Sequence, residues 1–210
     1  MFLLENIAHI FCWIGGKTLF KFFLHFQVTG KEKLKGLKGP LIVAFNHAFW
    51  LDPIFINAAL PPTSKLVPIR FATWYKHYWK FLPFTFASGA FPVKKGIGLE
   101  NSLKEGLKIL KKGGVVGIAP EEKRRHLGRR RNPRRGVAFL ALKIGAPILP
   151  VLIKGSTGLD TSKILSRTGK VVVKIGEKIS CPPQWSSKDD EDLEAFANYV
   201  MEKIYRLENV

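Results

Sequence analysis

Apolar runs of strand length alternate along this chain with longer segments whose apolar residues recur at helical spacing. The run at 41–45, Leu-Ile-Val-Ala-Phe, contains no polar residue, which is typical of a strand buried on both faces of a sheet. Alternation of such strands with helices predicts an α/β fold, with a mostly parallel central sheet flanked by helices in an αβ sandwich. The strands are expected at 41–45, 65–69, 90–93, 115–119, 148–153 and 170–175. The helices are expected at 52–60, 73–81, from 99 to the glycine pair 113–114, at 134–144 and, with Ser187 as N-cap, at 188–207.

The N-terminal segment has the pattern of an amphipathic helix rather than that of a membrane span. Its apolar residues form one stripe at helical spacing, made of Leu3, Ile7, Ile10, Phe11 and Ile14. The longest uncharged run, 6–16, is shorter than the roughly 20 residues that a spanning helix needs, and the features of a signal peptide are missing. We therefore expect residues 1–27 to form an interfacial amphipathic helix on a membrane and residues 28–210 to form the folded domain. A helix packed onto the domain itself is the alternative.

Composition adds a strong positive charge and many aromatic residues. The chain has 34 lysines and arginines against 16 acidic residues, a formal charge of +18, together with 16 phenylalanines and 5 tryptophans. Such a charge implies an anionic partner, which can be nucleic acid, an anionic membrane surface or a phosphorylated substrate. Aromatic residues interleaved with lysines at 70–84, and the arginine-rich run at 123–135, favour the membrane surface, so we expect no specific nucleic-acid partner. An aromatic core helix and a solvated loop are the respective alternatives.

The two cysteines do not indicate a metal site. Cys12 and Cys181 stand far apart and match no metal-ligand spacing. We expect two unpaired thiols in a reducing compartment.

A histidine and an aspartate follow the first predicted strand, at the kind of strand end where α/β proteins carry their chemistry. His47 and Asp52 belong to the segment 46–53, Asn-His-Ala-Phe-Trp-Leu-Asp-Pro. On a straight helix, residues at this spacing point about 140° apart, so the two meet only if His47 lies in the turn and Asp52 begins the helix. Pro53 suits the first helical turn and supports this arrangement. Asp52 would fix the tautomer of His47 and leave the other ring nitrogen as a base; a histidine that caps a helix is the alternative.

Three further segments carry candidate chemistry or flank it. In 118–125, Ile-Ala-Pro-Glu-Glu-Lys-Arg-Arg, Glu121 can accept a hydrogen bond from a hydroxyl and Arg124 can bind a phosphate; a solvated charged loop is the alternative. The segment 89–95 is an apolar run that ends in two lysines, and 145–151 is a proline-bracketed strand. Because 118–125 follows a strand, as the histidine does, we expect both at one edge of the sheet.

In their order and intervals, these four segments resemble the motifs of the glycerolipid acyltransferases of the PlsC type. That family has N-H-x-x-x-x-D, then a glycine and an apolar run ending in arginine, then F-P-E-G-T-R, then an apolar V-P-V strand. The resemblance covers about residues 28–175 and implies that His47 is the general base and Asp52 its orienting partner. It implies acyl transfer, without cofactor or metal, from acyl-CoA or acyl carrier protein to a glycerol phosphate or a lysophospholipid such as 1-acyl-glycerol-3-phosphate. The substrate-binding residues that it implies are Asn46, Lys95, Glu121, Lys123 and Arg124.

The sequence departs from the family pattern where the acceptor would bind. Glu122 and Lys123 replace the glycine and threonine of F-P-E-G-T-R, Phe49 replaces a common serine, and Lys95 replaces an arginine and loses its bidentate fork. These changes leave the acyl-transfer chemistry intact and put the acceptor in question. We expect a monotopic acyltransferase on the cytoplasmic face of the cell membrane. Two alternatives are an acyltransferase for a different lipid acceptor and a non-catalytic basic module of the same fold that binds membranes or nucleic acid.

Overall fold

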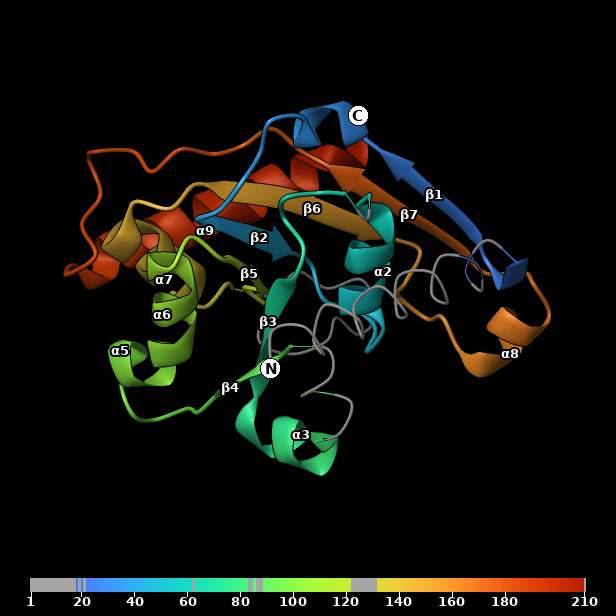
Figure 1. Ribbon diagram of the computed structural model, residues 1–210, viewed down its shortest axis with the longest axis horizontal. Helices are drawn as coiled ribbons and strands as arrows, with labels where there is room; N and C mark the ends of the chain where they lie inside the picture. The colour runs from blue at the N-terminus through green and yellow to red at the C-terminus, as the bar shows by residue number, and fades with distance from the viewer. Residues whose placement is uncertain are drawn as a thin grey trace.

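The computed structural model describes residues 18, 20, 22–61, 63–82, 85, 89–121 and 132–209. Its strands form a sheet in the order β1-β7-β6-β2-β5-β3-β4 (Figure 1). Strands β2 to β6 run parallel to one another, β7 is antiparallel to β6, and β1 is parallel to β7, which confirms the mostly parallel sheet. The strands are β1 (His25–Thr29), β2 (Leu41–Phe45), β3 (Ile69–Trp74), β4 (Phe91–Val93), β5 (Val115–Ile118), β6 (Ile148–Lys154) and β7 (Lys170–Ile175).

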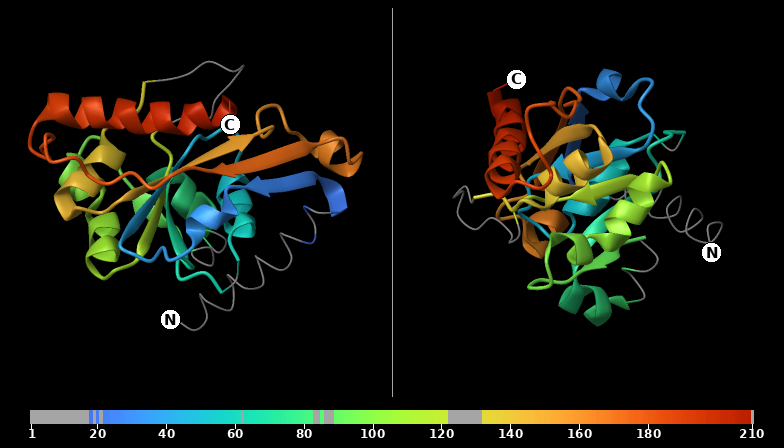
Figure 2. Two further views of the ribbon diagram at one scale, coloured as in Figure 1. Left: turned by 90° about the horizontal axis from the view of Figure 1, so that it is seen from above. Right: turned by 90° about the vertical axis from the view of Figure 1, so that its left-hand side faces the viewer.

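Helices cover both faces of the sheet, as the predicted sandwich requires. In Figure 2, α9 lies along one face and α2 lies on the opposite side, and the core residues of α6 and α7 cluster with those of α9. The described α-helices are α2 (Asp52–Ala59), α3 (Tyr75–Lys80), α5 (Leu99–Ser102), α6 (Lys104–Lys111), α7 (Gly136–Ile144), α8 (Thr161–Leu165) and α9 (Asp190–Arg206). Short 3-10 turns lie at η1 (Lys31–Leu34) and η2 (Leu207–Asn209).

The packing of β2 explains why its sequence has no polar position. Leu41, Val43 and Phe45 belong to the core cluster under α2, whereas Ile42 and Ala44 belong to the cluster under α7 and α9. Because side chains alternate across a strand and helices cover both faces, each of the five is at most 4% exposed. The strand is therefore held from both sides, which fixes the position of the residues that follow it.

The strand expected at 65–69 is displaced toward the C-terminus. Strand β3 begins at Ile69, which pairs with Val115 of β5, and ends at Trp74, which pairs with Val93 of β4. Pro68 has no N–H to donate to a ladder, which suits the position just before the strand. Pairing with two neighbours thus outweighs the local pattern, and α3 begins at Tyr75 instead of 73.

Two predicted helix boundaries also differ from the structure. The helix expected from 99 is divided at Leu103, where the backbone leaves the helical region (φ −106°, ψ 12°) between α5 and α6. The last helix is capped by Asp189 rather than Ser187, since the Asp189 carboxylate accepts hydrogen bonds from the N–H groups of Glu191 and Asp192. Helix α8, only five residues long, was not expected.

The first strand corrects the expected extent of the N-terminal helix. His25–Thr29 pairs with β7, so residues 25–27 belong to the sheet and not to a helix. Side chains of this edge strand alternate between exposed and half-buried, and a pattern of five such residues is too short to stand out in the sequence. Of the earlier residues, Phe20 lies against Phe55 of α2, with ring centroids 4.7 Å apart, whereas 1–17 lie outside the described residues. Among the described helices, none is long and apolar enough to cross a membrane.

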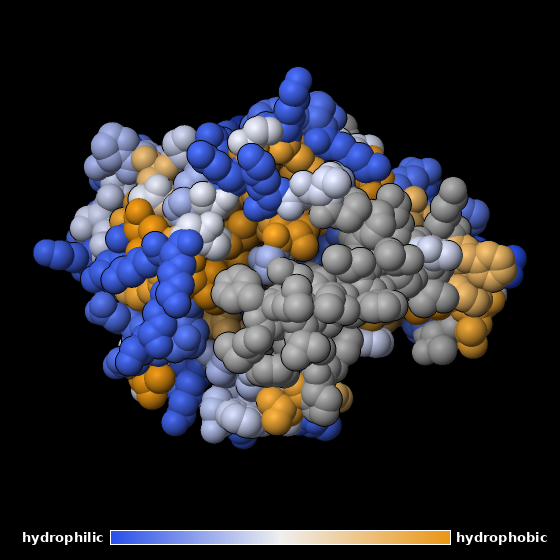
Figure 3. Space-filling model, viewed as in Figure 1, coloured by the Kyte–Doolittle hydropathy of each residue, from blue (hydrophilic) through white to orange (hydrophobic). Residues whose placement is uncertain are grey.

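Large aromatic side chains lie exposed beyond the C-terminal ends of β2 and β3. We call these residues the aromatic surface: Trp50, Trp74, Tyr75, Trp79 and Phe81. Each is at least 40% exposed, and α3 contains no buried residue, which rules out the alternative of an aromatic core helix for this part of the chain. Figure 3 shows apolar side chains over α8, whereas hydrophilic side chains dominate over α5 and α6.

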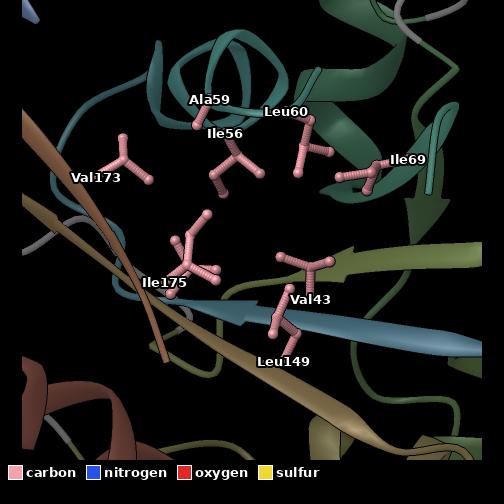
Figure 4. Close-up of a pocket in the computed structure, with 9 residues that line it drawn as sticks. Val43, Ile56, Ala59, Leu60, Ile69, Leu149, Val173 and Ile175 are labelled. Atoms are coloured by element: carbon pink, nitrogen blue, oxygen red, sulfur yellow. The ribbon is translucent and has the colours of Figure 1, made fainter. Parts of the chain in front are cut away.

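A small apolar cavity lies between α2 and the sheet. Figure 4 shows Ile56 and Ala59 of α2, and Leu60 directly after it, directed toward Val43 of β2 and Leu149 of β6. The other side chains that line it are Ile69, Val151, Val173 and Ile175. Every lining residue is aliphatic, so the site offers no polar partner to a water molecule.

The substitution Leu149→Ala is expected to lower the free energy of unfolding by about 3 kcal/mol, because it enlarges this cavity and water cannot refill it. Leu149 is 1% exposed, whereas Leu165 on α8 is 66% exposed and provides the matched control. For Leu165→Ala we expect a change below about 0.5 kcal/mol. Urea denaturation measures both values, and equal losses in the two variants would contradict the packing described for this face.

Candidate active site

The side chains of His47 and Asp52 meet in the turn between β2 and α2. Helix α2 begins at Asp52, and His47 lies in the preceding loop. This is the arrangement predicted from the spacing, because two residues five apart on one helix could not meet. His47 Nδ1 is 2.9 Å from Asp52 Oδ2, and the Asp52 side chain is fully buried. The predicted contact between the two residues is therefore confirmed.

The surroundings of Asp52 decide which ring nitrogen carries the proton. Its Oδ2 also accepts hydrogen bonds from the backbone N–H groups of Ala48 and Phe49, both at 2.7 Å. Because this oxygen already accepts hydrogen bonds from two N–H groups, it also faces His47 as an acceptor, and Nδ1 is the donor of the third bond. We therefore assign the proton of a neutral His47 to Nδ1, which leaves the lone pair on Nε2.

The imidazole of His47 lies at the protein surface, whereas its backbone is held in the core. The side chain is 25% exposed, and its ring makes an edge-on contact with Phe45 at a centroid distance of 6.4 Å. Exposure of part of the ring gives a substrate access to it, while the buried Asp52 limits its rotation. The arrangement can accept a proton from a bound hydroxyl and stabilise the resulting imidazolium.

Glu121 lies beside this turn because β5 is the parallel neighbour of β2. Ala44 pairs with Ile118, so the residues that follow both strands emerge at the same edge of the sheet, as predicted. Glu121 is 1% exposed, and its Oε2 lies 3.4 Å from the backbone N of His47. The other oxygen, Oε1, accepts a hydrogen bond from the hydroxyl of Tyr205 on α9.

Tyr205 was missed at the level of the sequence. It lies four residues after Met201, in line with Ala197, on the buried face of α9, and it is itself 6% exposed. A buried tyrosine needs a partner for its hydroxyl, so its place on this face was a signal that it meets a polar group. The sequence alone gives no way to choose Glu121 as that group.

Asn46 is tied to the neighbouring strand β6. Its Nδ2 donates to the carbonyl of Ile153 at 2.9 Å, and its Oδ1 accepts from the N–H of Ile153 at 2.7 Å. The side chain is 2% exposed. Both groups of the amide are thus used in holding the end of β2 against β6, which favours a structural role over the expected substrate contact.

The remaining expected substrate-binding residues are placed only in part. Lys95 follows β4 at the same edge of the sheet, and its Nζ lies 5.0 Å from the centroid of the Trp74 ring at the end of β3. Lys123 and Arg124 lie outside the described residues, as does most of the basic run at 123–135.

The described residues contain no cluster of histidine, cysteine and acidic side chains able to hold a metal ion. Cys181 is a free thiol whose Sγ lies 3.2 Å from the carbonyl oxygen of Ala146, and burial raises its pKa. A thiol with a raised pKa is a poor nucleophile, so Cys181 is a packing residue. Cys12 lies outside the described residues.

The known proteins that this chain resembles are acyltransferases. The family model named Acyltransferase matches residues 25–154, a range that includes His47, Asp52 and Glu121. The chain is 27% identical over 187 residues to the 1-acyl-sn-glycerol-3-phosphate acyltransferase of Bacillus subtilis (strain 168), which covers 87% of this chain and 88% of that relative.

The fold is also that of a solved structure. The crystal structure of the 1-acyl-sn-glycerophosphate (LPA) acyltransferase PlsC from Thermotoga maritima matches with a TM-score of 0.71 and 21% identity, over 98% of this chain and 78% of that one. The resemblance inferred from the four motifs is thereby confirmed, and so is the predicted fold. This chain therefore belongs to the acyltransferase family.

Proposed function

We propose that this acyltransferase moves a fatty acyl group from a thioester donor to the free hydroxyl of 1-acyl-glycerol-3-phosphate. The observation that carries the proposal is the contact of 2.9 Å between His47 Nδ1 and the buried Asp52, which leaves Nε2 available at the sheet edge. The acceptor is suggested by the name of the Bacillus subtilis relative, which aligns with most of this chain. An intact histidine–aspartate pair also argues against a non-catalytic module.

The proposed reaction is a direct transfer in which His47 is the general base. Nε2 takes the proton of the acceptor hydroxyl as its oxygen attacks the thioester carbonyl carbon, and Asp52 stabilises the imidazolium that forms. The tetrahedral intermediate collapses with cleavage of the carbon–sulfur bond, and the proton passes from Nε2 to the departing thiolate. One ester bond forms and one thioester bond breaks, so no redox change or covalent enzyme intermediate is needed.

The acceptor phosphate is proposed to bind to cations at the edge of the sheet that carries His47. Lys95 lies at this edge, after β4, and Lys123 and Arg124 follow Glu121 in the chain. Lysine offers a phosphate a point charge, whereas arginine offers a planar fork, so the lysine at 95 makes this site less selective for geometry. Acyl-CoA and acyl carrier protein are both proposed donors, since both are anionic and the formal charge of +18 favours their approach.

We also propose that the enzyme works on the cytoplasmic face of the cell membrane, bound to an anionic surface. The aromatic surface supports this, because tryptophan and tyrosine prefer the headgroup region and the lysines among them favour anionic lipid. Lys76 and Lys95 stack on Trp74, at 5.6 and 5.0 Å from its ring centroid, so cations and aromatic rings share one surface. The amphipathic segment that precedes β1 is proposed as a second contact with the membrane.

Substitution of His47 by glutamine is expected to lower the rate of acyl transfer by about 10²–10⁴-fold, because the general base is lost while the size of the side chain is nearly kept. Release of thiol from acyl-CoA in the presence of 1-acyl-glycerol-3-phosphate measures the rate. His25→Gln, on the exposed edge strand β1, is the matched control and should retain wild-type activity. Full activity of H47Q would refute the proposed mechanism.

The variant Asp52→Asn should lower kcat by at least about 10²-fold, because its amide oxygen can replace Oδ2 in all three hydrogen bonds but carries no charge to stabilise the imidazolium. Asp160→Asn alters another aspartate at a helix start, which caps α8 through the N–H of Lys163. This control should keep kcat and lose at most about 1 kcal/mol of stability. If the two variants had the same kcat, the charge of Asp52 would have no role in the transfer.

For the aromatic surface, Trp79→Ala is expected to weaken binding to phosphatidylglycerol-containing vesicles about tenfold, since a side chain that is 53% exposed would lose its place among the headgroups. The control Lys111→Ala removes one charge from the end of α6 and should change binding much less. Vesicle co-sedimentation gives both affinities. Unchanged binding of W79A, or an equal loss in both variants, would show that net charge alone drives association.

A further inference from the structure

Helix α9 reaches the candidate active site through one side chain, although it lies outside the matched family region. The family model ends at residue 154, whereas the Tyr205 hydroxyl on α9 donates a hydrogen bond to Glu121 Oε1. Both side chains are buried, Glu121 at 1% exposed and Tyr205 at 6%. Residues 84 positions apart are thus joined directly beside the catalytic turn.

The two oxygens of Glu121 face different elements. Oε1 is held by Tyr205, and Oε2 lies 3.4 Å from the backbone N of His47. The same peptide is held from its other side by Asn46, whose amide is bonded to the backbone of Ile153. The main chain at His47 therefore lies between one contact to β6 and one to the loop after β5.

We propose that Tyr205 is a positioning residue, which fixes the orientation of Glu121 and thereby the position of the His47 backbone and imidazole. This inference rests on the proposed function, in which Nε2 of His47 takes the proton of the acceptor hydroxyl. Glutamate has three rotatable side-chain bonds, so its carboxylate needs a fixed partner to present one oxygen to a given N–H group. The tyrosine hydroxyl is such a partner, because it is carried by a rigid ring on a long helix.

The packing of α9 determines where that hydroxyl lies. Phe196, Val200 and Ile204 of α9 are completely buried in the core cluster that also contains α7 and one face of β2. An ion pair between Arg135 and Asp190 joins the start of α9 to the residue before α7. A helix anchored along its length by core residues has little freedom to shift, so Tyr205 is held at a constant distance from β5.

The test compares Tyr205→Phe with Tyr199→Phe, which removes a hydroxyl from a half-buried tyrosine on the same helix. The ring of Tyr199 stacks on Phe196 and contacts Trp185 at a tilt, so its variant is the matched control. We expect Y205F to lower kcat about ten- to hundredfold at a temperature well below unfolding, with little change in the KM for acyl-CoA, and to lower the melting temperature by several degrees because a buried carboxylate oxygen loses its donor. Y199F should match the wild type in all three.

A double-mutant cycle with Glu121→Gln separates positioning from a general effect on the fold. If Tyr205 acts through Glu121, Y205F should cause almost no further loss of kcat in the E121Q background. The proposal would be overturned if the loss of kcat in the double variant equalled the product of the losses in Y205F and E121Q. It would also be overturned if Y205F had the kcat of the wild type. If the wild type itself failed to acylate 1-acyl-glycerol-3-phosphate, the proposed function would fail instead.

A measurement that needs no substrate separates failure of the positioning role from failure of the proposed function. In a ¹H–¹⁵N correlation spectrum of the full chain, Y205F should shift the His47 backbone amide and speed its hydrogen exchange, because the carboxylate that faces it has lost its fixed orientation. Y199F should leave that resonance in place. An unmoved His47 amide in Y205F would overturn the positioning role whatever the substrate of the enzyme.

Discussion

Asp52 is a fully buried carboxylate whose Oδ2 receives three groups from one turn, namely the N–H of Ala48, the N–H of Phe49 and Nδ1 of His47. A buried charge is costly unless it is hydrogen-bonded, so the turn must fold around this oxygen. The hydrogen bonds to Asp52 that close the turn therefore also fix the orientation of the His47 ring.

The sheet fixes the position of this turn relative to the neighbouring strands β5 and β6. Because β2 is buried on both faces and lies between β6 and β5, the residues after it emerge at a fixed place beside those that follow β5. Asn46 ties this end of β2 to β6, and Glu121 faces it from β5. The partly exposed imidazole is thus set on a rigid frame, and rigid placement of a catalytic group lowers the entropic cost of reaching the reactive geometry.

The sequence allowed prediction of those features that depend on neighbours in the chain. The run at 41–45 indicated a doubly buried strand, and the angle between residues on a helix was enough to place His47 in the turn and Asp52 at the start of α2. Features that depend on distant partners were not accessible. The partner of Asn46 lies 107 residues away, and that of Glu121 lies 84 residues away.

The boundary errors have the same origin. Strand β3 starts later than its local pattern indicates because it pairs with β5 and β4, and β1 was taken for the end of a helix because its pairing with β7 leaves only a short, half-exposed pattern. Tyr205 belongs to this class as well. Its helix was predicted, but its proximity to Glu121 arises only when α9 packs across the finished sheet.

The proposed acyl transfer requires that Asp52 hold the neutral His47 with its proton on Nδ1 and its lone pair on Nε2. Long-range ¹H–¹⁵N correlation spectra of the imidazole, recorded on the wild type at a pH where the ring is neutral, report the tautomer directly. The contact with Asp52 predicts a protonated Nδ1 and an unprotonated Nε2 for His47. A wild-type ring protonated at Nε2 would rule out His47 as the base, because that nitrogen would then have no lone pair to accept the proton of a hydroxyl.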